Sequence, residues 1–516
     1  MSTTALELAR RPVSRRSLLQ LAGLGGLTLA VGPQVMRSAS AQGDLVEELV
    51  IDLASEPDSF DPALTYKIDG WSVVHSVYDS LYQYGPEGAL EPLLAQSAPA
   101  LIDPLTYEIK LRPGVTFHNG EPVDAKSVAF SVAHIVDEKT GSQIAGQFKV
   151  ISEVKEIDPL TVHLVLAQPA PWLPAQIAAW LTPLPPQYAG SNDFVAKPVG
   201  TGPYKFVEWK PGERISLEIN PDYFAGSPKG RPVAQRVTYR FVPDASTRVA
   251  DLLASTAHLV RSVPVDQMES VTGSGAGVQP VPVSGSAWVR IATDVAPFSD
   301  VRVRQALNYA VDVDAIRDAL YGGYGQRLPN FFAPGGLGFD PALAPYSYDP
   351  ERARALLSEA GYPDGFETTL DHTIGERPDL PEAIAGQLAE VGIKVTTQPQ
   401  EDAAFNAAWK DPNAAPLRLA TWRPLFDPYT LLSLVVSNKG FLSRYDSPTV
   451  QPLIDAFASE TDLAKRAEVG HQLGKALYDD PAAIYLFNLT SLYGVADDVT
   501  AWTPRADDYI IATARG

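Results

Sequence analysis

The chain has 516 residues, a formal net charge of −20 at pH 7 and a pI near 4.8, so nucleic acid and anionic membrane surfaces are not expected partners of its main body. The absence of cysteine excludes disulfides, thiolate metal sites, a cysteine nucleophile and a lipid on an N-terminal cysteine. The seven histidines include no HExxH pattern and no close pair, so we expect no metal and no cofactor.

The first 41 residues have the pattern of an export signal. Arg15 and Arg16 precede an apolar run over residues 18–31, and residues 39–41 supply the small side chains that a signal peptidase requires. The apolar run is short for a membrane anchor, the alternative interpretation, which needs about 20 residues. We therefore expect residues 1–41 to be a cleaved twin-arginine signal peptide and the protein to work in the periplasm or on the outer side of the cell membrane.

The next part of the chain is predicted to alternate strands with short helices. Residues 49–53 and 161–166 are predicted strands, and residues 73–82 carry apolar side chains at helical spacing. Asp124 is a predicted N-cap of the helix that follows it. His118 could be read as catalytic, but we favour a turn histidine that is hydrogen-bonded to backbone.

Residues 197–226, KPVGTGPYKFVEWKPGERISLEINPDYFAG, are the most informative stretch. Gly200 and Gly202 mark a tight turn in which residues without a Cβ fit most easily. Pro211 and Gly212 form a second turn, with glycine at the position that needs positive φ. Apolar residues alternate with polar ones on both sides of this second turn, which predicts a β-hairpin.

The composition changes near the middle of the chain. Residues 271–286 are rich in Gly, Ser, Pro and Val, which is typical of a linker, and we place a crossing from a first lobe to a second lobe there. Further on, Asp300 and Asp349 are predicted helix N-caps, and strands are expected at residues 366–371 and 392–397. This alternation of strands and helices predicts an α/β lobe.

Several segments resemble the family 5 extracellular solute-binding proteins, the dipeptide and oligopeptide receptors of ABC importers. The resemblance includes GTGPY at residues 200–204, NPDYF at 220–224, PFSDVRVRQALNYAVD at 297–312 and YDPERARALLSEAGYPDG at 348–365, and it spans essentially the whole chain after the signal. Residues 255–258, STAH, depart from the family's GEID, which weakens the local match but not the fold.

The resemblance implies an α/β, two-lobed, periplasmic-binding-protein-like fold of the large family 5 type, with an extra subdomain in the first lobe and a hinge between the lobes. It places lobe I with the extra subdomain at residues 44–283 and lobe II at 284–487. A C-terminal segment, residues 488–516, is expected to return to lobe I.

The resemblance also implies a function. We expect an extracytoplasmic receptor that captures a peptide-like or other small solute between the lobes and delivers it to the membrane subunits of an ABC permease. We expect a monomer with no catalytic residues, and therefore no enzyme, since GxSxG, Walker A and HExxH motifs are absent from the sequence. An exported hydrolase acting on peptides or glycosides and a structural or adhesive surface protein are the alternatives.

Candidate ligand contacts follow from the same resemblance. In the family, the segment after the first strand and turn approaches the ligand, and here this segment is residues 65–71. Trp422 matches a tryptophan that lines the family's cleft, although a core position suits it nearly as well. Arg423 would suit a carboxylate, a phosphate or a stacked ring, and a solvated arginine is the alternative. The candidate ligand-binding residues are Tyr66, Trp71, Trp288, His372, Trp422, Arg423 and Asn488.

One departure from the peptide receptors concerns the charge of the ligand. After this tryptophan those receptors carry an Asp that pairs with the peptide's α-ammonium, but here the stretch is one residue shorter and Leu425 falls at that position. Asp427 is explained more simply as the cap of the helical run at residues 429–436. Because an ammonium is costly to bury without a counter-charge, we expect a neutral or anionic ligand, such as an oligosaccharide or a blocked or acidic peptide-like molecule. The three tryptophans in the set could stack on sugar rings, although aromatic residues line peptide pockets too.

Overall fold

The computed structural model of the chain describes residues 45–514, except residues 66, 86–87, 191–193 and 423–426. The chain divides into two compact units, residues 1–43 and 44–516, and the described residues all belong to the second. The predicted signal peptide lies outside the described residues, as do Tyr66, Arg423 and Leu425.

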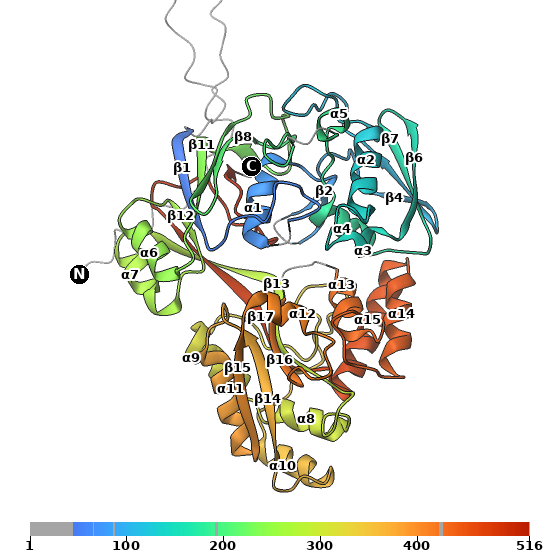
Figure 1. Cartoon of the computed structure of the whole chain (residues 1–516), viewed down its shortest axis with the longest axis vertical. Coiled ribbons are helices and arrows are strands. Elements are labelled where there is room, and N and C mark those ends of the chain that lie inside the picture. Colours follow the sequence, from blue (N-terminus) through green and yellow to red (C-terminus); the bar gives the residue numbers. More distant parts are fainter. Residues whose placement is uncertain (1–44, 66, 86–87, 191–193, 423–426, 515–516) are drawn as a thin grey trace, which may run out of the picture. The chain divides into compact units, whose positions relative to one another are not determined.

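A ten-stranded mixed sheet runs through this unit in the order β15-β14-β16-β13-β17-β12-β1-β11-β9-β8. Its two long central strands are β13 (Gly277–Ile291) and β17 (Ala483–Val495), which pair antiparallel (Figure 1). The other strands of the sheet are β1 (Val46–Leu53), β8 (Tyr204–Lys210), β9 (Arg214–Ile219), β11 (Ala234–Phe241), β12 (Leu259–Arg261), β14 (Phe366–Thr373), β15 (Ile393–Gln400) and β16 (Leu417–Trp422).

The sheet serves two lobes. At one end β17 pairs with β12, which is parallel to β1, and at the other end β13 pairs with β16, which is parallel to β14. The largest hydrophobic core draws its residues from positions 49–259 and 493–514, whereas two further cores draw theirs from positions 287–487. The two central strands are therefore shared by both lobes.

The first lobe carries a second, smaller sheet. Four antiparallel strands in the order β4-β5-β7-β6 lie beside α2 and α4 (Figure 1). The elements of this region are β2 (Tyr82–Tyr84), β3 (Leu90–Pro92), β4 (Ala100–Asp103), β5 (Thr106–Lys110), α2 (Ala125–Val136), α3 (Ala145–Phe148), β6 (Ile151–Asp158), β7 (Thr161–Leu166), α4 (Leu173–Trp180) and α5 (Pro186–Ala189).

Helices cover both faces of the sheet in the second lobe. Successive residues of β13 point to opposite faces, and both faces are buried. Ala287, Val289 and Ile291 enter one core, and Trp288 enters the other. The helices of this lobe are α8 (Val301–Tyr309), α9 (Val313–Tyr321), α10 (Pro350–Glu359), α11 (Asp379–Glu390), α12 (Asp402–Ala407), α13 (Tyr429–Leu431) with the π-helical turn Leu432–Val436, α14 (Val450–Ser459) and α15 (Leu463–Asp479).

The predicted helix caps are confirmed. The carboxylates of Asp124, Asp300 and Asp349 each accept a hydrogen bond from a backbone N–H in the first turn of α2, α8 and α10. Each cap satisfies one of the donors that a helix leaves unpaired at its N-terminus.

The predicted hairpin is confirmed as β8 and β9, and Gly212 in its turn has φ of 72°. The turn before it presses against the end of α1 (Ile68–Val77), where a Cβ on Gly200 would lie 2.0 Å from the carbonyl oxygen of Val77. His118 joins the same contact, since its Nε2 lies 3.0 Å from the carbonyl oxygen of Gly202 and its Nδ1 accepts from the N–H of Gly200. His118 is thus a turn histidine bonded to backbone, as predicted.

Two predicted elements differ from the structure. Residues 271–286 were expected to be a linker, but they contain the end of α7 (Met268–Gly273) and the first half of β13. Hydrogen bonding to β17 outweighs the composition, and Pro280 and Pro282 are tolerated because this half of β13 pairs with one strand and leaves an edge. The helix expected at residues 73–82 is α1, which starts earlier and ends at Val77, where the glycine turn meets it.

The C-terminal residues pack on the first lobe. β18 (Thr513–Ala514) pairs with β10 (Arg231–Pro232), and Trp502 and Ile510 belong to the largest core. The remaining elements, on the side of β12, are α6 (Ala245–Leu253) and the 3-10 turn Val265–Gln267. Within the described ranges, no helix combines the length and the apolarity that crossing a membrane requires.

Candidate functional site

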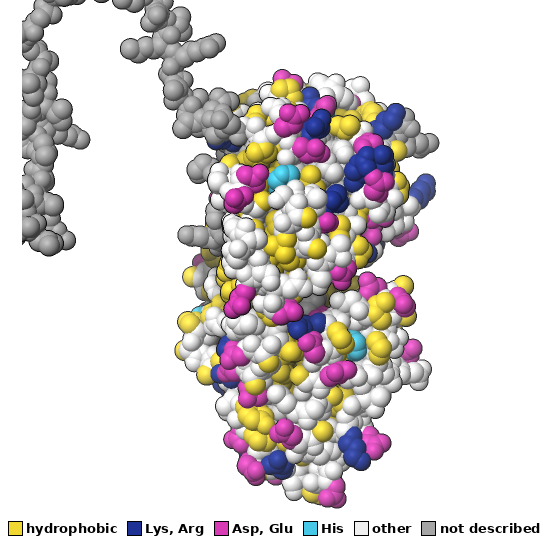
Figure 2. Space-filling view, turned by 90° about the vertical axis from the view of Figure 1, so that its left-hand side faces the viewer, with side chains coloured by type: hydrophobic (Ala, Val, Ile, Leu, Met, Phe, Trp, Pro, Cys, Tyr) yellow, Lys and Arg dark blue, Asp and Glu magenta, His cyan; other side chains and the backbone are white. Residues whose placement is uncertain are grey.

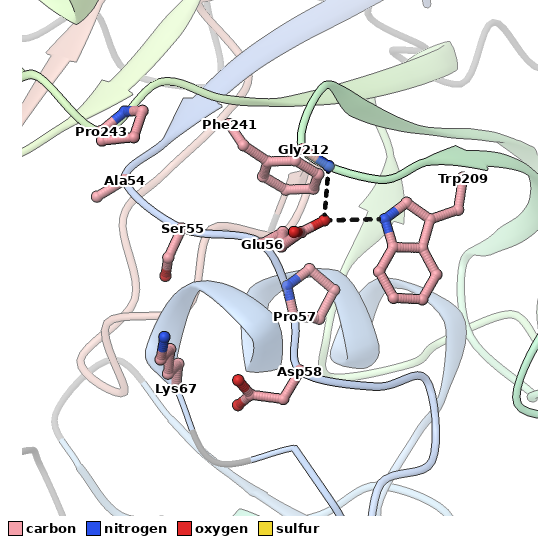
Figure 3. A pocket seen from close by; sticks show the side chains of 10 residues that line it. All are labelled: Ala54, Ser55, Glu56, Pro57, Asp58, Lys67, Trp209, Gly212, Phe241 and Pro243. Carbon is pink, nitrogen blue, oxygen red and sulfur yellow. Dashed lines mark hydrogen bonds between the residues drawn. The ribbon is translucent and has the colours of Figure 1, made fainter. Parts of the chain in front are cut away.

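A pocket of about 540 Å³ lies at the carboxyl ends of the parallel strands β1 and β11 (Figure 3). This edge of a parallel sheet is where α/β proteins commonly place ligands. The pocket is lined by the loop after β1, the residue before α1, the β8–β9 hairpin and the end of β11, namely Ala54, Ser55, Glu56, Pro57, Asp58, Lys67, Trp209, Gly212, Phe241 and Pro243.

Fixed and exposed charges share this pocket. The Glu56 carboxylate accepts hydrogen bonds from Trp209 Nε1 at 3.2 Å and from the backbone N–H of Gly212 at 3.0 Å, so the hairpin tip is tied to the loop after β1 (Figure 3). Asp58 and Lys67, both exposed, bring opposite charges to the rim. Trp209 and Phe241 add two aromatic side chains to the lining of the pocket.

The start of α1 is held by buried charge. Asp69 accepts hydrogen bonds from the backbone N–H groups of Ala54 and Ser55 at 3.0 Å, and its other oxygen lies 3.1 Å from Arg261 Nε. Arg261 also pairs with Asp508 at 2.7 Å, which ties the C-terminal segment to the same point. The loop that leads into the predicted ligand segment 65–71 is therefore rigidly anchored.

Trp71 belongs to an aromatic stack inside the first lobe. Its ring lies 5.1 Å from that of His75, which stacks on Tyr509 at 4.7 Å. Burial lowers the pKa of His75 well below its ordinary value, with Lys229 and Arg505 as smaller causes. Trp71 is 2% exposed, and its buried Nε1 has no hydrogen-bond partner among the described residues.

Two of the predicted residues lie on either side of the same β13 residue, where the central strands pass between the lobes. Trp422, at the end of β16, and Asn488, in β17, both lie opposite Ser286 of β13. The Asn488 side-chain oxygen accepts from the N–H of Gln326 at 2.5 Å, and the Trp422 indole N–H has no partner among the described residues. Ser286, which the sequence did not single out, completes this group.

His372 and Trp288 lie in different surroundings. His372, at the end of β14, is buried, and its Nδ1 is 3.0 Å from the carbonyl oxygen of Thr373. Trp288 is 1% exposed and packs edge to face on Phe331 at 5.6 Å, with Trp409 at 6.3 Å. In this structure Trp288 is a core residue and offers no accessible stacking surface.

Asp427 is fully engaged. It pairs with Arg466 through both oxygens, at 2.7 and 2.9 Å, and it accepts a hydrogen bond from the N–H of Tyr429 at the start of α13. Asp427 therefore bonds the first N–H of the helix, as a cap would, although the N-cap position itself is held by Pro428. The Arg466 pairing adds a partner that the sequence did not reveal. Burial raises the pKa of Tyr84, a tyrosine of the first lobe, well above its ordinary value, and the charge of Asp427 is the next cause.

The structure thus places Trp422 and Asn488 on either side of Ser286 and keeps Trp71, Trp288 and His372 in separate surroundings. Across the part of the chain that the structure describes, no group of three or more His, Asp or Glu side chains is placed to hold a metal ion. Acidic and basic side chains are interspersed on the face seen in Figure 2. Glu56 and Trp209 of the pocket were missed, because their contact joins residues 153 positions apart.

Comparison with known proteins defines the class. Residues 89–443 match the bacterial extracellular solute-binding proteins, family 5. The glutathione-binding protein GsiB of Pectobacterium atrosepticum is 31% identical over 357 residues, which are 68% of this chain and 68% of that protein.

Two solved structures extend the similarity to nearly the full fold. DppA from Helicobacter pylori, in complex with the peptide STSA, has a TM-score of 0.79 at 25% identity and covers 92% of this chain and 99% of its own. AgaA from A. tumefaciens R10, in complex with agropinic acid, has a TM-score of 0.77 at 26% identity and covers 91% and 98%.

The fold is therefore that of the two-lobed periplasmic binding proteins, as the sequence predicted. The chain belongs to the family 5 extracellular solute-binding proteins. Members of this family are periplasmic or extracellular, and the relatives named above are binding proteins rather than enzymes.

Proposed function

We propose that the protein is the extracytoplasmic receptor of an ABC importer, which captures a small solute between its lobes and delivers it to a membrane permease without chemical change. Family membership is the observation that carries this proposal. The shared strands β13 and β17 support it, because two lobes joined by two strands can close on a ligand that contacts both. The relatives' ligands, glutathione, a peptide and agropinic acid, are all small molecules.

The proposed lobes keep the boundaries of the sequence analysis, residues 44–283 and 284–487, with residues 488–516 returning to the first lobe. The composition of the hydrophobic cores supports this division. The proposed route to the outer side of the membrane is the twin-arginine signal at residues 1–41, and the working form is a monomer.

We place the ligand near Trp422 and Asn488, with Tyr66 and Arg423 as further contacts. The buried residues Trp71, His372 and Trp288 are supports of the surrounding walls. The grouping of Trp422 with Asn488 at the lobe crossing supports this choice. Ligand binding is expected to change Trp422 fluorescence, and this change should disappear in Trp422→Phe. A fluorescence change on ligand titration that is the same in both proteins would show that Trp422 has a purely structural role.

The proposed ligand is neutral or anionic. Asp427 is the first acidic residue after Trp422 in the sequence and lies two positions beyond Leu425. Its carboxylate is already paired with the Arg466 guanidinium. An ammonium placed there would compete with a bidentate guanidinium pair, which is among the stronger ionic contacts in proteins. Agropinic acid, the ligand bound to AgaA, is an acid by name and is in keeping with this charge.

Mass spectrometry of the small molecule that copurifies with the protein tests the proposed function most directly. Calorimetry with a mixed tripeptide library and an oligosaccharide panel then tests the ligand class. Submicromolar binding of peptides that is lost on N-acetylation would contradict the neutral or anionic ligand. Turnover of any bound peptide or glycoside would contradict the receptor function itself.

A further inference from the structure

The two lobes touch at a place away from the strands that join them. Gln176 Nε2, on α4 of the first lobe, donates a hydrogen bond of 2.6 Å to Thr430 Oγ1, on α13 of the second lobe. One helical turn earlier, the Trp172 ring lies 5.1 Å from the ring of Tyr429, at an angle of 32°. Figure 1 shows α4 and α13 facing each other to one side of β13 and β17.

This contact is built like a protein interior. Gln176 and Thr430 are at most 1% exposed, and Trp172 is 4% exposed. Tyr429 packs against the cores of both lobes. A hydrogen bond that is shielded from water and flanked by an aromatic pair is directional and favourable, and separation of the lobes would break both contacts.

The second-lobe half of the contact is held in place from behind. The N–H of Tyr429 is bonded to Asp427, whose carboxylate is fixed by Arg466. On the first-lobe side, the carbonyl of Ala175 accepts a hydrogen bond from Tyr84 at 3.2 Å. Both partners are therefore positioned before they meet, which lowers the entropy cost of forming the contact.

We propose that Trp172, Gln176, Tyr429 and Thr430 form a latch that stabilises the closed arrangement of the lobes without help from the ligand. The proposal rests on the receptor function argued above. A latch of this kind sets the fraction of protein that is closed before ligand arrives, and the apparent affinity scales with the fraction of the binding-competent form. These four side chains are positioning residues that tune affinity through closure.

The test measures closure in protein stripped of ligand by unfolding, dialysis and refolding. Because the chain contains no cysteine, Lys126→Cys on α2 and Ala456→Cys on α14, both exposed, can carry spin labels with no competing thiol. Double electron–electron resonance between the two spin labels then gives the distribution of interlobe distances. Thr430→Val, which removes the acceptor and keeps the shape, is expected to shift the ratio of open to closed protein by about 2- to 10-fold toward open.

Gln176→Leu should cause a similar shift. The double variant should open no further than either single variant, because both substitutions remove the same hydrogen bond. Ser433→Ala is the matched control, since it removes a 2.9 Å hydrogen bond to the carbonyl of Thr430 inside the second lobe and should leave the distribution unchanged. A parent protein that is entirely open, or a Thr430→Val distribution equal to the parent's, overturns the latch.

The folding of each variant is checked by circular dichroism, and Gln176→Leu replaces Thr430→Val if the latter proves unstable. Tyr429→Phe keeps the aromatic ring and should therefore stay as closed as the parent protein. Native mass spectrometry of the same unstripped variants asks separately whether a small molecule is retained. Retention of the small molecule without a latch effect overturns the latch alone, whereas loss of retention in the parent protein speaks against the proposed function.

Discussion

Asp427 illustrates, at the scale of the residue, what sequence spacing can and cannot reveal. Its place just before a helical run predicted a cap, because capping depends on neighbours within three residues. Its pairing with Arg466 was not predictable, since that partner is 39 positions away and is brought close by the packing of α15.

Replacement of Asp427 by Asn is expected to reduce the free energy of unfolding by about 3–5 kcal/mol, because it leaves the Arg466 guanidinium buried without its counter-charge. Urea denaturation followed by circular dichroism measures the change. The control is Asp455→Asn, whose partner Lys439 is 72% exposed and whose own side chain is 54% exposed, and which should cost less than about 1 kcal/mol. Equal losses in both variants would show that the buried pair contributes no more than a surface pair.

His118 makes stability depend on pH in a predictable direction. Burial lowers its pKa to about 4, against an ordinary value of 6.5. The unfolded chain therefore takes up a proton at a higher pH than the folded protein, so the stability that is fully present above pH 6.5 is lost as the pH falls toward 4. With about 1.4 kcal/mol for each pKa unit, the loss approaches about 3 kcal/mol.

Denaturation of the protein and of His118→Gln between pH 7.5 and 4.5 checks this effect. The glutamine can still donate to the carbonyl of Gly202 but does not titrate in this range. Its stability should fall less steeply on acidification than that of the parent protein. Parallel pH profiles would contradict a depressed pKa at His118.

At the scale of the element, local signals were reliable and composition was not. The capped helices and the β8–β9 hairpin were predictable because their caps and turns depend on residues a few positions apart. The strand character of residues 277–286 was not predictable, because β17, which pairs with them, is about 200 residues away in sequence. Long-range pairing decided an element whose own residues suggested a linker.

The glycine turn before β8 supplies a prediction at this scale. Gly200→Ala would place a methyl group against the Val77 carbonyl, so α1 or the turn must shift, at a cost of about 1–3 kcal/mol or more. Gly386→Ala, inside α11 with open space around the new methyl group, should instead stabilise the protein by about 1 kcal/mol. Thermal denaturation of both variants checks the contrast. An unchanged stability of Gly200→Ala would show that the turn can move away from the Val77 carbonyl without cost.

At the scale of the whole described unit, the two-lobed fold followed from family resemblance, while the assembly of the site did not follow from the sequence. The candidate residues come from stretches as far apart as Trp71 and Asn488, and only the sheet order places Trp422 and Asn488 on either side of one β13 residue. Trp288, two positions further along the same strand, is directed into a core, because helix packing fills that face of the sheet.

The central strands also indicate where the lobes bend. The pairing of β13 with β17 is irregular between Pro282 and Ser286 and again between Ser286 and Trp288, and such irregularities loosen a ladder and allow a strand to bend. Since both strands pass between the lobes at this point, we expect the lobes to move as rigid bodies about residues 282–288 when ligand binds.

Spin labels at Lys126→Cys and Ala456→Cys should therefore report a shorter interlobe distance when the copurifying compound, once identified, is added back to stripped protein. The matched control is a pair within the second lobe, Ala355→Cys on α10 with Ala456→Cys, whose distance should not change. The physical reason is that contacts to both lobes exist only in the closed arrangement, so the ligand favours that arrangement by its additional binding free energy. Identical interlobe distributions with and without the compound would contradict ligand-driven closure, and a change in the control pair would contradict rigid-body motion.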